Sequence, residues 1–276
     1  MTFLRSAATA VAISACSMGV YAADYTDGDT HKNDYKWMQA NLMYAFDELP
    51  GESSHDYLEL EFGGRAGALD YYGYLDVFNL TNSDSSDKAG KSKTFLKFAP
   101  RLSLDAITGK DLSFGPVQEV YFATLFNWGG GYDKGSNDDP VNNSFWGIGS
   151  DVMVPWLGKV SLNVYALYDL NAKKWDGYQV STNWFKPFHT FENGSFLSYQ
   201  GYIDYQWGVD KVSIPGVGQL KSSNGGTWYN GLYWHSKQYS LGYGLKMYKD
   251  IYALTDGGVA GKTSGAAHYI AATYKF

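Results

Sequence analysis

The chain has 276 residues, 28 acidic and 22 basic, and a formal net charge of -6. A nucleic-acid-binding face would need clustered Lys and Arg, so this balance disfavours nucleic acid as a partner. Aromatic residues make up 17% of the chain and no segment repeats apolar residues at helical spacing, which disfavours a helical soluble domain.

A cleavable export signal is predicted at residues 1–22. Arg5 precedes an apolar, alanine-rich stretch, and the small residues around Tyr21 have the spacing that signal peptidase reads, so we expect cleavage after Ala22. The stretch is shorter than the roughly 20 apolar residues of a membrane anchor. A lipobox-like alternative would leave Cys16 lipidated. Cys16 is the only cysteine, so the chain cannot form an internal disulfide.

The mature chain, 23–276, is predicted to be all-β. Apolar and polar residues alternate with a period of two, which places the two sets on opposite faces of a strand. We count about twelve such segments, several near the roughly 9–11 residues that a tilted transmembrane strand needs. The clearest of them, in chain order, cover residues 38–46, 58–62, 69–77, 120–126, 160–168, 197–207, 239–247 and 270–276.

The connections alternate between short turns and long acidic or glycine-rich loops, as in outer-membrane barrels. Short turns are expected at 66–68, 155–158 and 236–237, and long outward loops at 47–56, 81–93, 129–145, 208–226 and 250–265. Two connections, near 105–115 and 187–195, are longer than a periplasmic turn should be. An even number of strands would put both termini in the periplasm, with 23–36 as a periplasmic N-terminal segment.

A transmembrane antiparallel β-barrel explains these features better than a soluble sandwich. The outward set is Leu, Val, Phe and Ile rather than Lys and Glu, and tryptophans lie near the segment ends, where aromatic girdles meet the membrane interfaces. These tryptophans are Trp37, Trp128, Trp146, Trp184, Trp207 and Trp234. The outer surface would then contact lipid and lipopolysaccharide of a Gram-negative outer membrane. The terminal Phe276 is typical of the signal that the barrel-assembly machinery recognises.

Several segments resemble the Tsx-like nucleoside-specific channel-forming family, and within it the outer membrane protein K group. They are DGDTHKNDYKWMQANLM (27–43), AFDELPGESSHDYLELEFGGR (45–65), TGKDLSFGPVQEV (108–120), GIGSDVMVPWLGKV (147–160), STNWFKPF (181–188), SYQGYIDYQW (198–207) and NGLYWHS (230–236). The resemblance implies a twelve-stranded barrel that works as a channel, and some members serve as bacteriophage receptors. The stretches near 81–93, 129–145, 208–226 and 255–265, which are predicted external loops, carry no such resemblance.

The side chains that the alternation turns inward are the candidates for lining a pore and contacting a solute. They combine tyrosines with charges of both signs, and they are Glu59, Glu61, Arg65, Asp70, Tyr72, Tyr74, Asp76, Lys97, Arg101, Glu119, Tyr121, Asp151, Tyr165, Tyr202, Asp204 and Lys246. Aromatic faces can stack on a nucleobase, while carboxylates accept hydrogen bonds from ribose hydroxyls. A bulge at Pro100 would reverse the orientation of Arg101, because proline cannot donate to the ladder.

The sequence therefore predicts an outer-membrane channel for passive diffusion of small solutes, nucleosides above all, which a phage tail protein could use as a receptor. The alternative is a surface receptor or structural barrel with little transport of its own. Inward charges of both signs would also be expected in that case, because they can pair with one another and stabilise a small barrel without binding a solute. No cofactor is expected.

Catalysis and metal binding are not predicted. The histidines are scattered over different segments, and neither a GxSxG elbow nor an HExxH pair occurs. Asp27 and Asp29, and the acidic run 137–139, offer oxygen ligands of the kind that calcium prefers, yet neither has the ligand count of a dedicated site.

Overall fold

The computed structural model describes residues 24–131 and 140–276, so the predicted signal peptide, its cleavage site and Cys16 lie outside the described residues. Twelve antiparallel strands close into a barrel in the order β1-β14-β13-β12-β9-β8-β7-β6-β5-β4-β3-β2. The predicted all-β barrel of about twelve strands is thereby confirmed. Closure pairs each of these twelve strands with two neighbours, so the barrel itself has no free edge.

The barrel strands are β1 (Tyr35–Glu48), β2 (Ser53–Ala66), β3 (Leu69–Phe78), β4 (Thr94–Ser103), β5 (Val117–Gly130), β6 (Asn142–Val154), β7 (Gly158–Asp169), β8 (Lys174–Thr190), β9 (Phe196–Trp207), β12 (Asn224–His235), β13 (Tyr239–Lys249) and β14 (Gly265–Lys275). A separate hairpin is formed by β10 (Val212–Ile214) and β11 (Gly218–Lys221). Among residues 24–131 and 140–276 there are also two short helices, α1 (Leu104–Thr108) and η1 (Ile251–Ala253). No helix in the described parts of the chain is long and apolar enough to cross a membrane.

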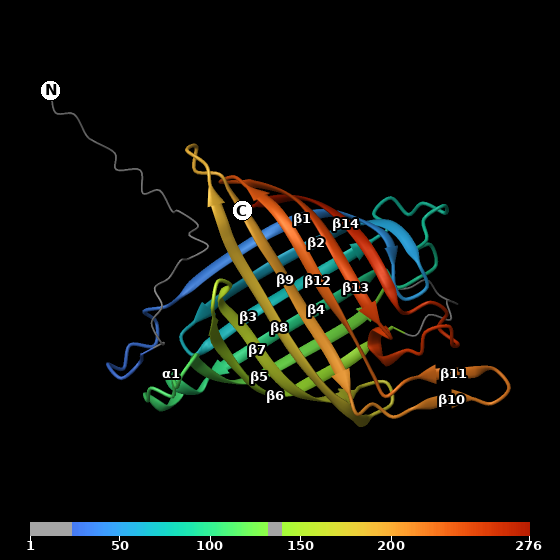
Figure 1. The fold of residues 1–276 in the computed structure, drawn as a ribbon, viewed down its shortest axis with the longest axis horizontal. Helices are drawn as coiled ribbons and strands as arrows, with labels where there is room; N and C mark the ends of the chain where they lie inside the picture. Colours follow the sequence, from blue (N-terminus) through green and yellow to red (C-terminus); the bar gives the residue numbers. More distant parts are fainter. Residues whose placement is uncertain (1–23, 132–139) are drawn as a thin grey trace.

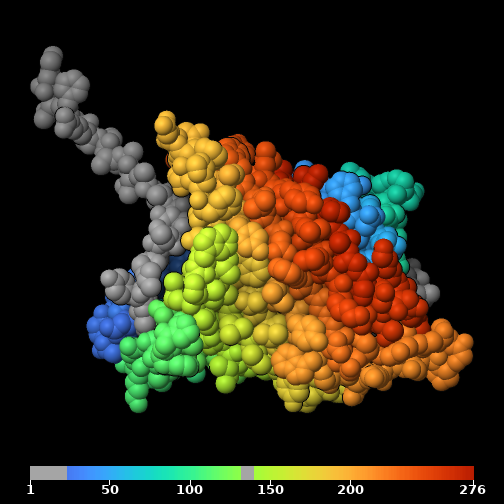
Figure 2. Space-filling model, viewed as in Figure 1, coloured from blue at the N-terminus to red at the C-terminus, as the bar shows by residue number. Residues whose placement is uncertain are grey.

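The two ends of the barrel differ as the loop lengths predict. We call the end with the C-terminus and the three short turns the terminal end, and the opposite end the loop end. Figure 1 shows α1 at the terminal end and the β10–β11 hairpin projecting from the loop end. Figure 2 shows that hairpin standing clear of the packed wall.

Several connections differ in length from the prediction, because the strands continue further than the alternation indicates. Between β1 and β2 only residues 49–52 remain outside strands. β8 runs through Pro187 to Thr190 with a register shift between Pro187 and His189, since proline has no N–H to give to the ladder. α1 occupies part of the connection after β4, where the Ser103 side chain accepts a hydrogen bond from the Ala106 N–H and caps the helix.

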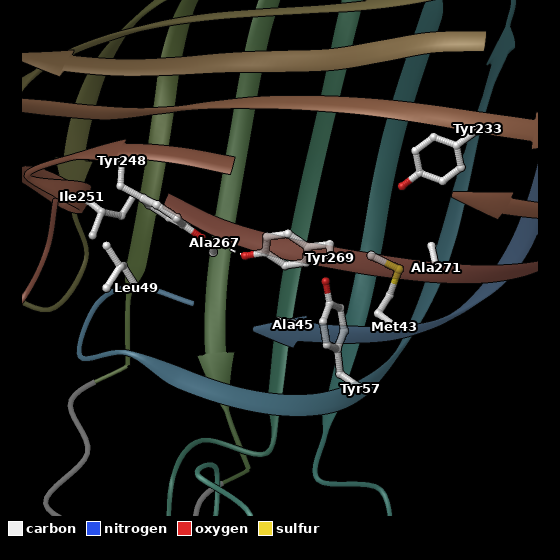
Figure 3. Close-up of a cluster of buried hydrophobic side chains, with 10 residues drawn as sticks. All are labelled: Met43, Ala45, Leu49, Tyr57, Tyr233, Tyr248, Ile251, Ala267, Tyr269 and Ala271. Carbon is white, nitrogen blue, oxygen red and sulfur yellow. Dashed lines mark hydrogen bonds between the residues drawn. The ribbon is translucent and has the colours of Figure 1, made fainter. Parts of the chain in front are cut away.

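The alternation assigns the two faces of the wall correctly. On β1, Leu42 is 54% exposed on the outside while its neighbour Met43 is buried inside. Pro100 causes no shift: the β3–β4 pairing continues through it, and Arg101 points inward to Asp70. The interior at the loop end is packed with apolar and tyrosine side chains, among which the Tyr248 and Tyr269 hydroxyls lie 2.7 Å apart (Figure 3).

Candidate functional site

The lumen at the terminal end is filled by two arginines and the carboxylates that bind them. Arg65 on β2 donates to both oxygens of Glu119 at 2.9 and 2.6 Å, and its Nε donates to the Gly67 carbonyl at 3.0 Å. Such fork-to-fork pairing is among the strongest hydrogen-bonded contacts in proteins. Arg65 and Glu119 are both buried, so this pair is a fixed part of the interior.

Arg101 on β4 makes the second arginine centre. Its Nε lies 2.8 Å from Asp70 and its Nη1 lies 3.0 Å from Asp151. The guanidinium also stands 4.0 Å from the ring centroid of Tyr121, whose hydroxyl donates to Glu119 at 2.6 Å. Two arginines and three carboxylates are thus joined through one phenol into a continuous network across β2 to β6.

Residues before β1 contact this network from the terminal end. Tyr25 is only 1% exposed, and its ring centroid lies 5.1 Å from the Arg65 guanidinium. The Asn33 side-chain amide donates to the Tyr25 hydroxyl at 3.0 Å, and Asp34 accepts the Gly67 N–H at 2.7 Å. Burial raises the pKa of the Tyr25 phenol. The N-terminal segment is therefore anchored on the barrel mouth.

Midway along the barrel an ion pair spans the lumen. Lys97 on β4 and Asp204 on β9 lie on opposite walls, yet the ammonium nitrogen is 3.0 Å from the carboxylate. Asp204 also accepts a hydrogen bond from the Ser181 hydroxyl at 2.6 Å. Both charged side chains keep about a fifth of their surface exposed, so the pair meets water within the lumen.

Stacked tyrosines flank this ion pair. The rings of Tyr202 and Tyr229 are 5.5 Å apart and 15° from parallel. The ammonium groups of Lys97 and Lys246 lie 5.6 and 5.9 Å from the Tyr202 centroid, distances at which a cation is attracted to the negative face of a ring. Gly244 on β13 leaves space for Tyr229, because a Cβ there would collide with the phenol ring.

The facing wall is acidic. Glu61 accepts hydrogen bonds from Gln39 at 2.5 Å, Asn41 at 3.1 Å and Tyr72 at 2.8 Å. Glu59 accepts a further one from Asn41 at 2.6 Å, and it lies opposite Asp76 in the β2–β3 register. The lumen therefore presents a cluster of carboxylates on β2 and β3, and Lys246 beside the stacked rings on the wall that faces them.

A cavity of about 60 Å³ opens between the ion pair and the loop end. Aromatic and polar groups share its lining, which comprises Tyr74, Phe95, Lys97, Asn127, Gln179, Tyr202, Asp204, Gln206, Gly225, Gly226, Thr227, Lys246, Ile251 and Tyr252. Burial raises the pKa of Tyr252 to about 12, so its phenol is neutral at physiological pH.

The cavity gathers only some of the residues that the alternation marks as inward. Five of them line it, namely Tyr74, Lys97, Tyr202, Asp204 and Lys246. Arg65, Asp70, Arg101, Glu119, Tyr121 and Asp151 belong to the network at the terminal end, and Glu59, Glu61, Tyr72 and Asp76 to the acidic wall. Tyr165 packs inside with Phe145 and Leu167, apart from the cavity.

Some lining residues were not singled out from the sequence. Phe95 and Gln206 share a strand and parity with Lys97 and Asp204, and Asn127 shares them with Tyr121, so counting along the strands would have found these three. Gln179 lies on β8, where the alternation marks no inward candidate from which to count. Tyr252 could not be found in this way, because η1 lies in a loop that folds back to the lumen and has no strand parity.

A serine and a histidine meet inside the terminal end, which the sequence did not indicate. Ser198 Oγ lies 2.8 Å from His235 Nε2, and Lys275 Nζ lies 3.2 Å from His235 Nδ1. An ammonium can only donate, so Nδ1 accepts and the proton of a neutral ring sits on Nε2. His235 then donates to Ser198 and cannot take its proton as a general base. In the described residues no group of three or more His, Cys, Asp or Glu could hold a metal ion.

Comparison with known proteins places this barrel in a family. Residues 32–276 match the family model described as nucleoside-specific channel-forming protein, Tsx. The chain is 62% identical to the outer membrane protein OmpK of Vibrio parahaemolyticus over 265 residues, 96% of each chain.

More distant relatives carry the name nucleoside-specific channel-forming protein Tsx. The protein from Klebsiella aerogenes is 34% identical over 75% of this chain and 72% of its own length. The protein from Salmonella typhimurium is 28% identical over 98% of each chain. The barrel fold and these relatives locate the protein in the outer membrane of a Gram-negative bacterium. The chain belongs to the Tsx family of channel-forming outer-membrane proteins.

Proposed function

We propose that this protein is an outer-membrane channel through which nucleosides diffuse passively. The observation that carries the proposal is the pair of stacked rings, Tyr202 and Tyr229, beside a polar cavity at the level of the Lys97–Asp204 pair. Twelve strands fall between the eight of a barrel plugged by side chains and the sixteen or more of a wide porin. A barrel of this strand number is expected to leave a narrow passage, which can select the solute that enters it.

The chemistry of the lining suits a flat, neutral, polyhydroxylated solute. The partly buried rings of Tyr74 and Tyr202 line the cavity and would offer stacking to a nucleobase, which is worth roughly 1–3 kcal/mol per base on such platforms. The amides of Asn127, Gln179 and Gln206 can donate to or accept from ribose hydroxyls and base edges. The 28% to 34% identical relatives named as nucleoside-specific channels support the same class of solute.

Single-channel recording tests this proposal. The protein, refolded into a planar bilayer, is titrated with adenosine and thymidine and then with glucose as a control of comparable size. We expect nucleosides at millimolar concentration to block the current and glucose to leave it unchanged. Equal block by glucose, or no block by either nucleoside, would refute nucleoside selectivity.

A second candidate is a surface receptor with little transport of its own. The observation that favours it is the ion pair that crosses the lumen beside a cavity of only about 60 Å³. The projecting β10–β11 hairpin would then be a natural contact for a phage tail protein (Figure 1). Absence of any open current, together with loss of phage adsorption when the hairpin is replaced, would favour this receptor over the channel.

Two further expectations complete the proposal. Both termini would face the periplasm, since the short turns cluster at the terminal end. Phe276 would be read by the barrel-assembly machinery. The C-terminal strand supports this role, because Phe276 N donates to the Met38 carbonyl at 3.1 Å and so joins the last residue to β1 at the closing seam.

A further inference from the structure

The outer wall at the terminal end carries an apolar hollow. It is lined by Trp156, Phe188, Tyr199 and Leu232, has a volume of about 300 Å³ and exposes no polar surface. Tyr199 turns its hydroxyl away to donate to Asn230 at 2.7 Å, which leaves only the ring in the lining. A volume of this size lies at the lower end of the roughly 300–1,000 Å³ range of small-molecule sites.

Two backbone irregularities shape this hollow. Trp156, in the turn between β6 and β7, has a φ of 68°, a conformation unfavourable for a large side chain. Its indole reaches past β8 to within 6.1 Å of the Tyr199 ring on β9. Phe188 follows Pro187, where the register between β8 and β9 shifts. The hollow is therefore built by specific backbone features, and regular strands alone would not create it.

A cation lies on the same face. Lys186 pairs directly with Tyr199 in the β8–β9 register, and Tyr199 pairs with Leu232 on β12, so all three side chains project outward in one row. Trp234 lies one outward position nearer the terminal end, where we expect the aromatic girdle of the membrane interface. At that depth a lysine stem can run along apolar surface while its ammonium reaches the headgroups.

We propose that this hollow holds one acyl chain of an outer-membrane phospholipid, with its phosphate bound by Lys186. The lipid is favoured over a protein segment because the wall faces the bilayer, where acyl chains are the abundant apolar partner. The charge of Lys186 complements an anionic phosphate at the point where the apolar lining ends. The site is independent of the lumen and of the proposed nucleoside transport.

Native mass spectrometry of the full mature protein tests the lipid site. The protein is released by mild detergent from vesicles of phosphatidylethanolamine and phosphatidylglycerol, and the phospholipid that stays bound is counted. We expect one lipid to be retained per barrel. Lys186→Gln should weaken retention about fivefold, the equivalent of the roughly 1 kcal/mol that a lysine near an anionic headgroup supplies. Leu232→Trp should abolish retention by filling the hollow.

Matched variants control for nonspecific effects. Leu42→Trp adds the same indole to an exposed position on β1, and Lys237→Gln removes a lysine from a turn at the terminal end. Both should retain lipid like the unchanged protein. The proposal is overturned if the unchanged protein retains no phospholipid, if lipopolysaccharide is retained in its place, or if the controls lose lipid equally. A dimer that Leu232→Trp separates would assign the hollow to a second copy instead.

Discussion

The ion pair across the lumen allows a quantitative test of how the two walls are joined. At 3.0 Å and an effective dielectric constant of about 20, the attraction between Lys97 and Asp204 is about 5.5 kcal/mol. Desolvation and side-chain ordering offset much of it, so we expect a coupling free energy of roughly 1–3 kcal/mol. Lys97→Met alone should cost more than Asp204→Asn, since it leaves a carboxylate in the lumen with neutral partners only.

The assay is a double-mutant cycle. The single and double variants are unfolded in urea from phospholipid vesicles, and the free energies of unfolding are extrapolated to water. The matched control is Lys174–Asp210, a pair 2.7 Å apart at the loop end whose side chains are 44% and 69% exposed. Its coupling should not exceed about 1 kcal/mol, because water screens it. Coupling for Lys97–Asp204 no larger than in this control would refute the argument.

Three further predictions concern other parts of the barrel. Gly244→Ala should lower the free energy of unfolding by about 1–3 kcal/mol, since the new methyl group meets the Tyr229 ring, and urea unfolding measures this. A hydrogen bond and the charge of Asp34 raise the pKa of His31 above 6.5, so Asp34→Asn should lower it in an NMR titration. A fluorophosphonate should not label Ser198, because the neighbouring histidine donates to the hydroxyl instead of accepting its proton.

Each of these has its control and its contradicting result. Gly130→Ala meets no atom closer than 4.0 Å and should change stability by less than about 0.5 kcal/mol; equal losses at Gly130 and Gly244 would exclude the steric explanation. An unchanged His31 titration after Asp34→Asn would disprove their contact. Labelling that disappears in Ser198→Ala would reveal a reactive serine, and a known serine hydrolase in the same reaction shows that the probe is active.

The His31–Asp34 contact also sets a pH window for the N-terminal segment. The folded pKa of His31 is raised, so its contribution is complete below about 6.5 and is lost as pH rises through the higher folded value. The pKa of Asp34 is lowered from 3.8 by hydrogen bonds from His31 and the Gly67 N–H, so its contribution is lost as pH falls through that lower value. The contact is therefore strongest in mildly acidic solution.

The inward residues show how much of the candidate site could be predicted from the sequence. Lys97, Tyr202 and Asp204 could be assigned to the lumen because side-chain direction alternates along a strand, which is a local property. Their meeting could not be predicted. Lys97 and Asp204 are separated by 107 positions, and whether they touch depends on the circumference of the closed barrel.

The limit of prediction from the sequence is clearest at residues that lie outside regular strands. Tyr252 reaches the cavity from a loop, and Trp156 leans over the outer wall from a turn with a left-handed backbone. Neither position has a periodicity from which its direction follows. Tyr25 is buried against Arg65 although it precedes the first strand.

The sequence by itself determined the barrel, its strand number to within the precision of counting, and which side chains face lipid or lumen. It could do so because side-chain direction alternates with a period of two along every strand, and the bilayer requires apolar side chains on the outer face. Only the tertiary structure decided that Lys97 reaches Asp204, that Arg65 pairs with Glu119, and that Ser198 meets His235 beside Lys275. Lys97 and Asp204 meet only when the sheet closes, Arg65 reaches Glu119 across two intervening strands, and Ser198 and His235 lie on β9 and β12, which pair although they are distant in the chain. No local pattern contains these contacts.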